Sequence, residues 1–251
     1  MDRFITDPTG LTVDDLKNND WDLIKLNITV DTTSIMDWVT TVQQDNQDSI
    51  WTFECDHLVD ALYMERFRQL QKKLLVRSET DLPEQWALQW SYQREGIIPF
   101  MIYADKEKFP EVYEEGFNEI WNQNLTKYEF GFWKRYYELL GPEVFNVTRL
   151  VRFPTNCGLN THRDTDKDTL IRMHTVPQIG SNHYFDYTDD MNNPVVDPAR
   201  QYKMEPGCTY LLNTGIPHKA INYDDKDWWM LHNNPTDDAV TKLCNMKVHV
   251  K

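Results

Sequence analysis

The chain has 251 residues, a formal net charge of −14 at pH 7, and 40% hydrophobic residues. This length is enough to bury a substantial core in one large domain or two small ones. The acidic balance argues against nonspecific binding of nucleic acid, which needs a basic surface, and against an anionic membrane as partner. An aromatic share of 13% predicts a wide core or an aromatic-lined pocket.

Cysteine spacing and the lack of long apolar runs indicate a compartment. The cysteines form no C-x-x-C motif, a pattern typical of free thiols in a reducing environment; they are Cys55, Cys157, Cys208 and Cys244. No apolar run approaches the roughly 20 residues that span a membrane. The opening MDRFI lacks the apolar core of a secretory signal. We therefore expect a cytoplasmic protein.

Residues from about 33 to 140 show mostly helical periodicity. Ile35, Trp38, Val39 and Val42 are spaced as one helix face, with Ser34 as the cap. Three further helices are predicted over about 57–76, from Pro110 onward, and from Tyr128 to Leu140, where Gly141-Pro142 ends the last. Their aromatic stripes are interpreted as packing faces.

After Gly141-Pro142 the pattern changes to short alternating runs that predict strands. These runs are 144–153, 158–164, 169–176, 182–187, 208–213, 217–223, 227–233 and a tail over 244–250. Many short strands favour a sandwich or jelly-roll barrel, with 188–200 as a loop at its mouth. We expect one globular unit over 1–251, in which a mostly helical region, 1–140, packs on a β core, 141–251.

Three residues on the predicted strands are candidate metal ligands. His162 and Asp164 are two apart, so on a strand they share a face, and His218 opens a later strand. Two imidazoles and one carboxylate leave coordination positions open, which suits non-haem Fe(II) oxygen chemistry. Alternatively, His162 and Asp164 form a surface pair in a charged turn, and His218 is an ordinary strand-start histidine. Taken together, their order and context predict a metal site.

A second pair lies on the strand after the H-x-D motif. Arg172 and His174 share one face with Leu170 and Val176. In a single-layer surface sheet they would face solvent. Inside a barrel, an arginine beside a metal would form a fork for a carboxylate, and His174 would supply a further hydrogen bond.

These motifs resemble the Fe(II)/2-oxoglutarate-dependent oxygenases, and within them the aspartyl/asparaginyl β-hydroxylase and proline-hydroxylase-like group. The resemblance covers about residues 143–233 and implies a double-stranded β-helix (jelly roll, cupin-like) packed against helices. It implies that His162, Asp164 and His218 hold the catalytic Fe(II), and that Arg172 and His174 bind 2-oxoglutarate. It further implies O₂-dependent hydroxylation of a small-molecule or peptide substrate: an amino acid, a peptide or a protein side chain.

The sequence departs from this family at one position. Trp228 stands where the family usually places an arginine for the far carboxylate of 2-oxoglutarate, and Lys226 lies two residues earlier. Arg172, or Arg149 or Arg152 on the preceding strand, could supply the cation. Two alternatives stay open: a metal-dependent cupin-type enzyme that does not use 2-oxoglutarate, and a jelly-roll binding module with structural histidines.

Overall fold

The computed structural model describes residues 2–45, 75–76, 84–90, 131–145, 147–153, 155, 157–164, 170–191, 195 and 197–251. The helix predicted to begin at Pro110 and most of the one over 57–76 lie outside these residues. The start of the helix predicted from Tyr128 also lies outside them.

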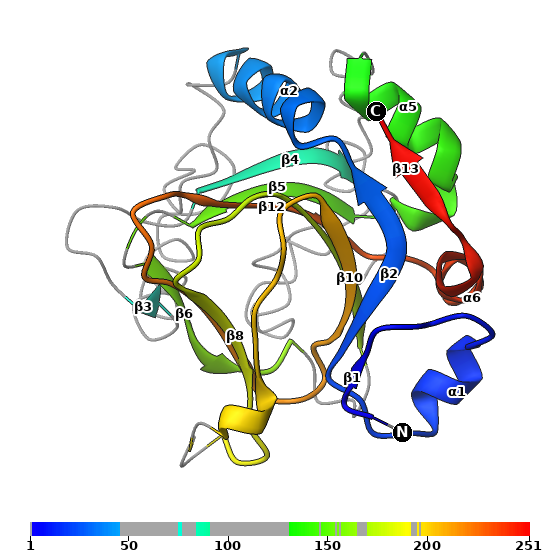
Figure 1. Ribbon diagram of the computed structural model, residues 1–251, viewed down its shortest axis with the longest axis vertical. Helices are drawn as coiled ribbons and strands as arrows, with labels where there is room; N and C mark the ends of the chain where they lie inside the picture. The colour runs from blue at the N-terminus through cyan, green and yellow to red at the C-terminus, as the bar shows by residue number, and fades with distance from the viewer. Residues whose placement is uncertain are drawn as a thin grey trace, which may run out of the picture.

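Two β-sheets face each other and enclose a barrel (Figure 1). The larger sheet contains β1 Phe4–Ile5, β2 Leu23–Val30, β4 Glu84–Trp90, β5 Val147–Phe153, β7 Ile171–Gln178, β10 Cys208–Asn213, β12 Trp228–Asn233 and β13 Val248–Val250. The smaller sheet contains β3 Leu75–Val76, β6 Cys157–His162, β8 His183–Tyr187, β9 Gln201–Tyr202 and β11 His218–Asn222.

The chain alternates between the two sheets as it winds along the barrel. The larger sheet runs β1-β2-β10-β7-β12-β5-β4, with β13 beside β2, and the smaller runs β3-β6-β11-β8-β9. Thus β5, β7, β10 and β12 lie in one sheet, whereas β6, β8 and β11 lie in the other. The pairs among these strands are antiparallel. This arrangement is a jelly roll, and the seven strands predicted between 144 and 233 are confirmed within a few residues at each end.

The described part of residues 1–140 is less helical than the sequence predicts. β2 crosses the larger sheet beside β10, and β4 extends that sheet next to β5. Ile24, Leu26, Ile28 and Val30 are buried on one face of β2, which is the alternation of a strand. Leu75–Val76, predicted as the end of a helix, is instead the strand β3. The prediction of a mostly helical N-terminal region is therefore wrong for these segments.

Helix ends also differ from the predictions in two places. The described helices are α1 Val13–Lys17, α2 Thr32–Asp45, α5 Gly131–Leu140 and α6 Asp237–Asn245, with 3-10 turns at Pro142–Val144 and Pro198–Arg200. The Asp31 carboxylate accepts from the backbone N–H of Ser34 at 2.7 Å, so Asp31 caps α2 in place of Ser34. Of the tail predicted as a strand over 244–250, only β13 is a strand. The first residues of the tail instead end the helix α6, which Thr236 caps.

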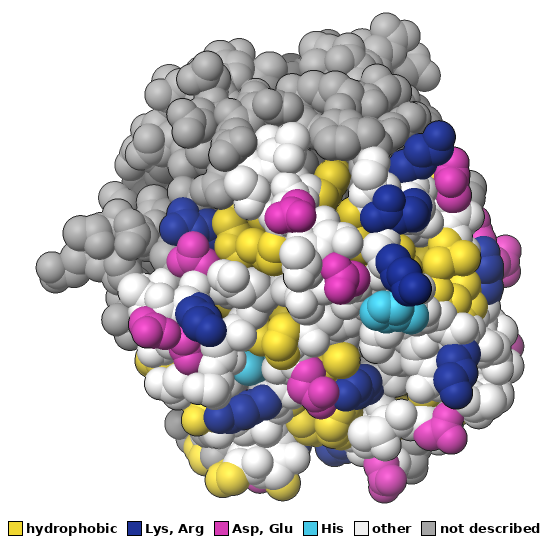
Figure 2. Space-filling model, turned by 45° about the horizontal axis from the view of Figure 1, so that its top comes forward, with side chains coloured by type: hydrophobic (Ala, Val, Ile, Leu, Met, Phe, Trp, Pro, Cys, Tyr) yellow, Lys and Arg dark blue, Asp and Glu magenta, His cyan; other side chains and the backbone are white. Residues whose placement is uncertain are grey.

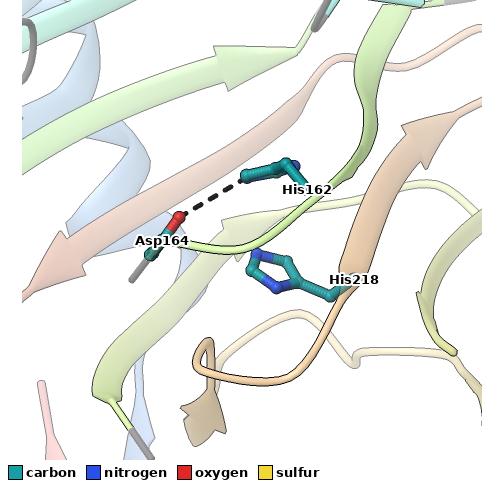
Figure 3. A group of neighbouring side chains, drawn as sticks. All are labelled: His162, Asp164 and His218. Atoms are coloured by element: carbon teal, nitrogen blue, oxygen red, sulfur yellow. Dashed lines mark ion pairs between the residues drawn. The ribbon is translucent and has the colours of Figure 1, made fainter. Parts of the chain in front are cut away.

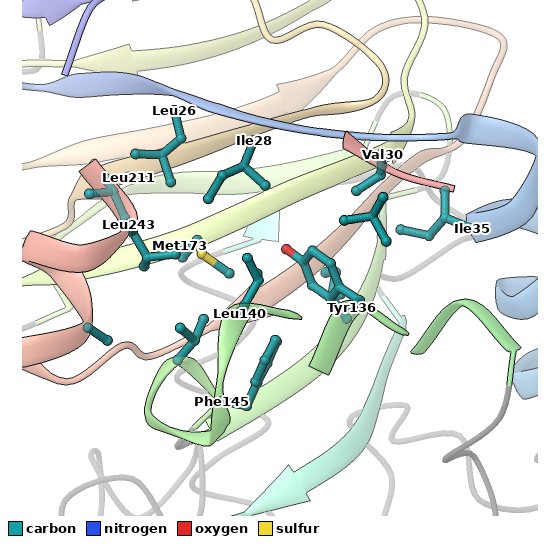
Figure 4. Packing of buried hydrophobic residues seen from close by; sticks show 14 of the residues in the cluster. Leu26, Ile28, Val30, Ile35, Tyr136, Leu140, Phe145, Met173, Leu211 and Leu243 are labelled. Carbon is teal, nitrogen blue, oxygen red and sulfur yellow. The ribbon is translucent and has the colours of Figure 1, made fainter. Parts of the chain in front are cut away.

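The helices α1, α2, α5 and α6 lie along the outer side of the larger sheet (Figure 1). Their apolar side chains and the outward side chains of the sheet form one buried cluster. Figure 4 shows Leu140 and Phe145 in the same cluster as Met173 and Leu211 from the sheet. α5 ends at Leu140 and is followed by Gly141, whose φ of +96° favours glycine. The helical layer therefore fixes one wall of the barrel from outside.

The barrel interior has its own apolar cluster, which fills one end. Phe153 and Trp228 are register partners there, and both are buried. Val176, Phe185 and Met230 continue this cluster inward along their strands. Other inward-facing polar side chains come from the opposite ends of the same strands, and His183, which lies against Trp228, is an exception.

Among the helices of the described ranges, none is long and apolar enough to cross a membrane. On the face drawn in Figure 2, acidic and basic side chains are interspersed with small apolar patches.

Candidate metal centre

The three predicted ligands meet at the polar end of the barrel. His162 ends β6 and His218 begins β11, and the two residues are register partners across the antiparallel pair. Asp164 lies just past the end of β6, where its backbone N–H donates to the Thr214 carbonyl at 3.1 Å. The strand predicted over 158–164 is therefore shorter, but its two side chains still converge on His218 (Figure 3).

The spacing of the donor atoms suits one metal ion. One ligand atom from each of His162, Asp164 and His218 lies within 4.8 Å of the others. Nε2 of His162 is 3.5 Å from Oδ1 of Asp164, and the two imidazole centroids are 4.5 Å apart. Nδ1 of His218 donates to the Ile216 carbonyl at 2.9 Å, which leaves the lone pair of a neutral ring on Nε2.

Electrostatics keep Asp164 and His218 in metal-binding protonation states. Burial opposes ionisation of Asp164, but the hydrogen bond from His162 and the charge of Arg172 outweigh it and hold its pKa well below the ordinary range. Burial, with a further contribution from His162, lowers the pKa of His218 to about 4. At neutral pH Asp164 is therefore a carboxylate and His218 a neutral imidazole. Two nitrogens and one carboxylate oxygen with open positions fit Fe(II) or a similar divalent ion.

Arg172 and His174 face the barrel interior from β7, as the alternation predicts. Met173 and Thr175 point the other way, and the Thr175 hydroxyl bonds to that of Tyr136 on α5. Arg172 is 7% exposed, and its Nε donates to Oδ2 of Asp164 at 3.3 Å. Arg172 thus contacts the carboxylate proposed to bind the metal.

His232 and Asn234 lie beside the inward-facing polar side chains of β7 and extend this group. Neither residue was identified as part of the site from the sequence. Nε2 of His174 and Nδ1 of His232 are 2.8 Å apart, and Nε2 of His232 is 3.0 Å from Oδ1 of Asn234. If the amide oxygen of Asn234 accepts, a neutral His232 accepts from His174 in turn. The alternation of Trp228, Met230 and His232 on the predicted strand 227–233 was the available signal for an inward histidine.

Three other cationic residues were considered as the anchor for the far carboxylate of 2-oxoglutarate, and they lie at different positions in the fold. Lys226 is exposed in the turn before β12. Arg152 lies on the outer face of β5, where its Nε donates to Asp227 at 2.8 Å. Arg149 is the register partner of His232. Trp228, which stands at the position expected for an arginine, is fully buried in the apolar cluster of the barrel interior.

A fully buried tyrosine was also missed. Tyr187 on β8 is the register partner of His218, and the two ring centroids are 6.0 Å apart. Burial, with a further contribution from the charge of Asp22, raises the pKa of Tyr187 well above its ordinary value, so its hydroxyl keeps its proton. Behind the ring, Asp22 accepts two hydrogen bonds from Arg200, at 2.8 and 2.6 Å.

No protein-family model matches this sequence, and no curated protein matches it either. Solved structures with a similar fold include an oxidoreductase of the 2OG-Fe(II) oxygenase family from Burkholderia pseudomallei. It is 10% identical and covers 78% of this chain and 89% of its own, with a TM-score of 0.35.

A prolyl-4-hydroxylase from Pseudomonas putida is 12% identical over 79% of this chain and 99% of its own, with a TM-score of 0.30. A cupin domain from Bordetella pertussis is 16% identical over 36% of this chain and 80% of its own, with a TM-score of 0.27. At these identities and TM-scores a shared activity does not follow from the likeness. The function must therefore be inferred from the site itself.

Proposed function

We propose that this protein is an Fe(II)- and 2-oxoglutarate-dependent oxygenase that hydroxylates an amino acid, a peptide or a protein side chain. The observation that carries the proposal is the convergence of His162, Asp164 and His218, with ligand atoms within 4.8 Å, at one end of a jelly roll. Two imidazoles and one carboxylate on one side of the metal leave positions for a chelating co-substrate and for O₂.

The residues around the ligands orient them and limit access of water. The Ile216 carbonyl holds the His218 ring in one tautomer, and the ring of Phe185 stacks on it at 5.4 Å. Arg172 holds the Asp164 carboxylate through Nε. When bound, Fe(II) would activate O₂ for hydroxylation of a C–H bond, with oxidative decarboxylation of the 2-oxo acid supplying two of the four electrons that reduce O₂.

Arg172 and His174 are proposed to bind the co-substrate. Arg172 uses Nε for Asp164, and its terminal amino groups are proposed to form the fork for a carboxylate of 2-oxoglutarate. His174 uses Nε2 to donate to His232 on the neighbouring strand β12, so it would donate to the same anion through Nδ1 when its ring is protonated. A buried carboxylate needs such a counter-charge, because an unpaired charge inside the barrel is costly.

A second candidate function is a metal-dependent cupin-type enzyme that does not use 2-oxoglutarate. The observation in its favour is Trp228, which is fully buried and packs on Phe153 with ring centroids 5.5 Å apart. An uncharged side chain thus fills the position at which the resemblance implies an arginine. This candidate keeps the same metal ligands and differs only in the co-substrate.

A metal titration followed by a product assay tests these functions. Metal-free protein is titrated anaerobically with Mn(II), and we expect stoichiometric binding that falls about 100-fold or more in His162→Ala and His218→Ala. His249→Ala, which changes an exposed histidine on β13, is the matched control. Unchanged affinity in the ligand variants, with native circular dichroism, would exclude the metal centre.

The second stage separates the two metal-dependent functions. Protein loaded with Fe(II) is given 2-oxoglutarate and O₂, and succinate is measured. Succinate release that depends on His162, Asp164 and His218 supports the oxygenase. Stoichiometric metal without binding or turnover of 2-oxoglutarate supports the cupin-type enzyme.

A further inference from the structure

Tyr187 is a polar side chain inside the barrel beside the metal centre. It lies on the inward face of β8, together with Phe185, and directly opposite His218 on β11. The residue is 1% exposed. Its ring centroid lies 6.0 Å from that of His218 and 6.0 Å from that of Tyr202, which donates to Asp22, so the side chain lies between the metal centre and the buried Asp22.

The hydroxyl of Tyr187 has no hydrogen-bond partner among the described residues. A buried hydroxyl without a partner destabilises a folded protein, so such groups are rare in native cores and point to a partner bound from outside the chain. Other buried tyrosines here do have partners. Tyr202 donates to Asp22 at 2.9 Å, and Tyr210 accepts from the backbone N–H of Glu205 at 2.9 Å.

The ring of Tyr187 is held on several sides and cannot easily turn its hydroxyl to solvent. Phe185 packs against it at 5.3 Å, and Tyr202 meets it edge-on at 6.0 Å. The guanidinium of Arg200 lies 6.0 Å from the ring centroid, fixed by its two hydrogen bonds to Asp22. This packing positions the hydroxyl before any ligand arrives, which lowers the entropic cost of binding.

We propose that the Tyr187 hydroxyl donates a hydrogen bond to a carboxylate of the ligand that binds at the metal centre. The inference rests on the proposed metal site and adds a ligand-binding residue to it. A protonated phenol is a donor whose strongest partner is an anionic oxygen. The metal ion and Arg172 would already attract a carboxylate of the ligand. The Tyr187 hydroxyl would add a directional hydrogen bond that favours one orientation of this carboxylate.

The test compares ligand affinity with stability in Tyr187→Phe, which removes the hydroxyl and keeps the ring. Binding of 2-oxoglutarate and of oxalate to the Mn(II)-loaded protein is measured by calorimetry. We expect Kd to rise about 10- to 100-fold, the usual loss for a hydrogen bond to a charged group. Because the variant removes an unpaired buried hydroxyl, we expect the melting temperature of the metal-free protein to stay the same or rise.

Tyr202→Phe is the matched control. Its hydroxyl has a protein partner, so we expect a lower melting temperature with carboxylate affinity nearly unchanged. For Tyr187→Phe, equal losses with both ligands place the donor at the carboxylate next to the metal, and a loss with 2-oxoglutarate alone places it at the remote carboxylate. Both outcomes support the proposal. Unchanged Kd for both ligands would overturn it.

Failure of the proposed function gives a different result. If the wild-type protein binds Mn(II) and oxalate but not 2-oxoglutarate, the oxygenase proposal fails, while the effect of Tyr187→Phe on oxalate still decides the role of the hydroxyl. If the Mn(II)-loaded wild-type protein binds neither carboxylate, the inference about Tyr187 is overturned as well.

Discussion

Arg172 combines two roles in one side chain. Its Nε holds Asp164, while its guanidinium faces the barrel interior beside His174. Arginine can do this because its donors form a rigid planar fork, whereas lysine offers a single point charge. The residue is therefore expected to affect both the metal ligand and the anion bound near it.

Arg172→Ala should raise the Kd of 2-oxoglutarate by about 100-fold or more, because a buried carboxylate loses its counter-charge. Metal affinity should fall by about 10-fold, since Asp164 loses a hydrogen bond that orients it. Calorimetry with Mn(II), alone and followed by 2-oxoglutarate, measures both effects. Arg172→Lys should recover part of the anion binding, as it keeps the charge but not the fork.

Arg152→Ala is the control for Arg172, because Arg152 pairs with Asp227 on the outer face of β5. We expect it to leave both affinities unchanged. If Arg172→Ala binds 2-oxoglutarate normally and Arg149→Ala does not, the anchor lies on β5. If neither variant changes the Kd of 2-oxoglutarate, neither arginine is the anchor and the prediction for Arg172 is wrong.

At the scale of elements, the core strands were predictable because their sequences form short apolar runs separated by turn residues. The runs from 144 to 233 carry alternating or continuous apolar residues between turns, and the observed strands fall within or close to them. β2 has the same alternation in Leu23–Val30, yet its place between β10 and β13 depends on distant partners. α6 was missed because an alternating tail suggested a strand, although Thr236 and the spacing of Val240 and Leu243 indicate a helix.

Local sequence patterns also predicted only part of the candidate site. His162 and Asp164 follow from local spacing, and His218 from its position at the start of a strand. The roles of Tyr187 and His232 depend on register between strands, which no local pattern contains. The ion pair of Asp22 and Arg200 joins residues 178 positions apart and could not be found without the fold.

The position of β2 predicts how a truncated chain behaves. A fragment of residues 141–251 lacks β2, α2 and α5, so it would expose the edge of β10 and the outer face of the larger sheet. Exposed edges and apolar faces favour aggregation. We expect the fragment to be insoluble or to unfold without cooperativity in a urea titration. A soluble fragment with a cooperative transition would show that the C-terminal half is an independent domain.

At the scale of the whole molecule, one buried ion pair joins the N-terminal segment to the loop before β9. Asp22 is fully buried and accepts hydrogen bonds from Arg200 and Tyr202, while Arg200 also pairs with the exposed Asp189. Asp22→Asn would leave the guanidinium of Arg200 without its buried counter-charge. We expect a loss of about 3–5 kcal/mol in the free energy of unfolding, measured with urea.

Lys17→Ala is the comparison for that change, because Lys17 and Asp237 form an ion pair between exposed side chains. Such pairs contribute about 1 kcal/mol or less. Similar losses in the two variants would show that the Asp22–Arg200 pair does not hold these segments together.

The stability of the whole protein should also depend on pH through His183. Burial lowers the pKa of His183 below 6.5, and the nearby charge of Lys203 lowers it further, although the Gly180 carbonyl opposes this shift. The Met204 backbone N–H donates to Nε2 of His183 at 2.8 Å, a bond that needs the neutral ring. The folded state therefore resists protonation that the unfolded chain accepts near pH 6.5.

The difference in the pKa of His183 between the folded and unfolded states determines how stability changes with pH. Above the unfolded pKa both states hold a neutral His183, and its contribution to stability is complete. As pH falls from about 6.5 towards the folded pKa, the unfolded state takes up the proton first and stability decreases. Urea unfolding of the metal-free protein at pH 7.5, 6.5 and 5.5 should show a smaller decrease in His183→Gln than in the wild type. Equal decreases would mean that His183 does not titrate differently in the two states.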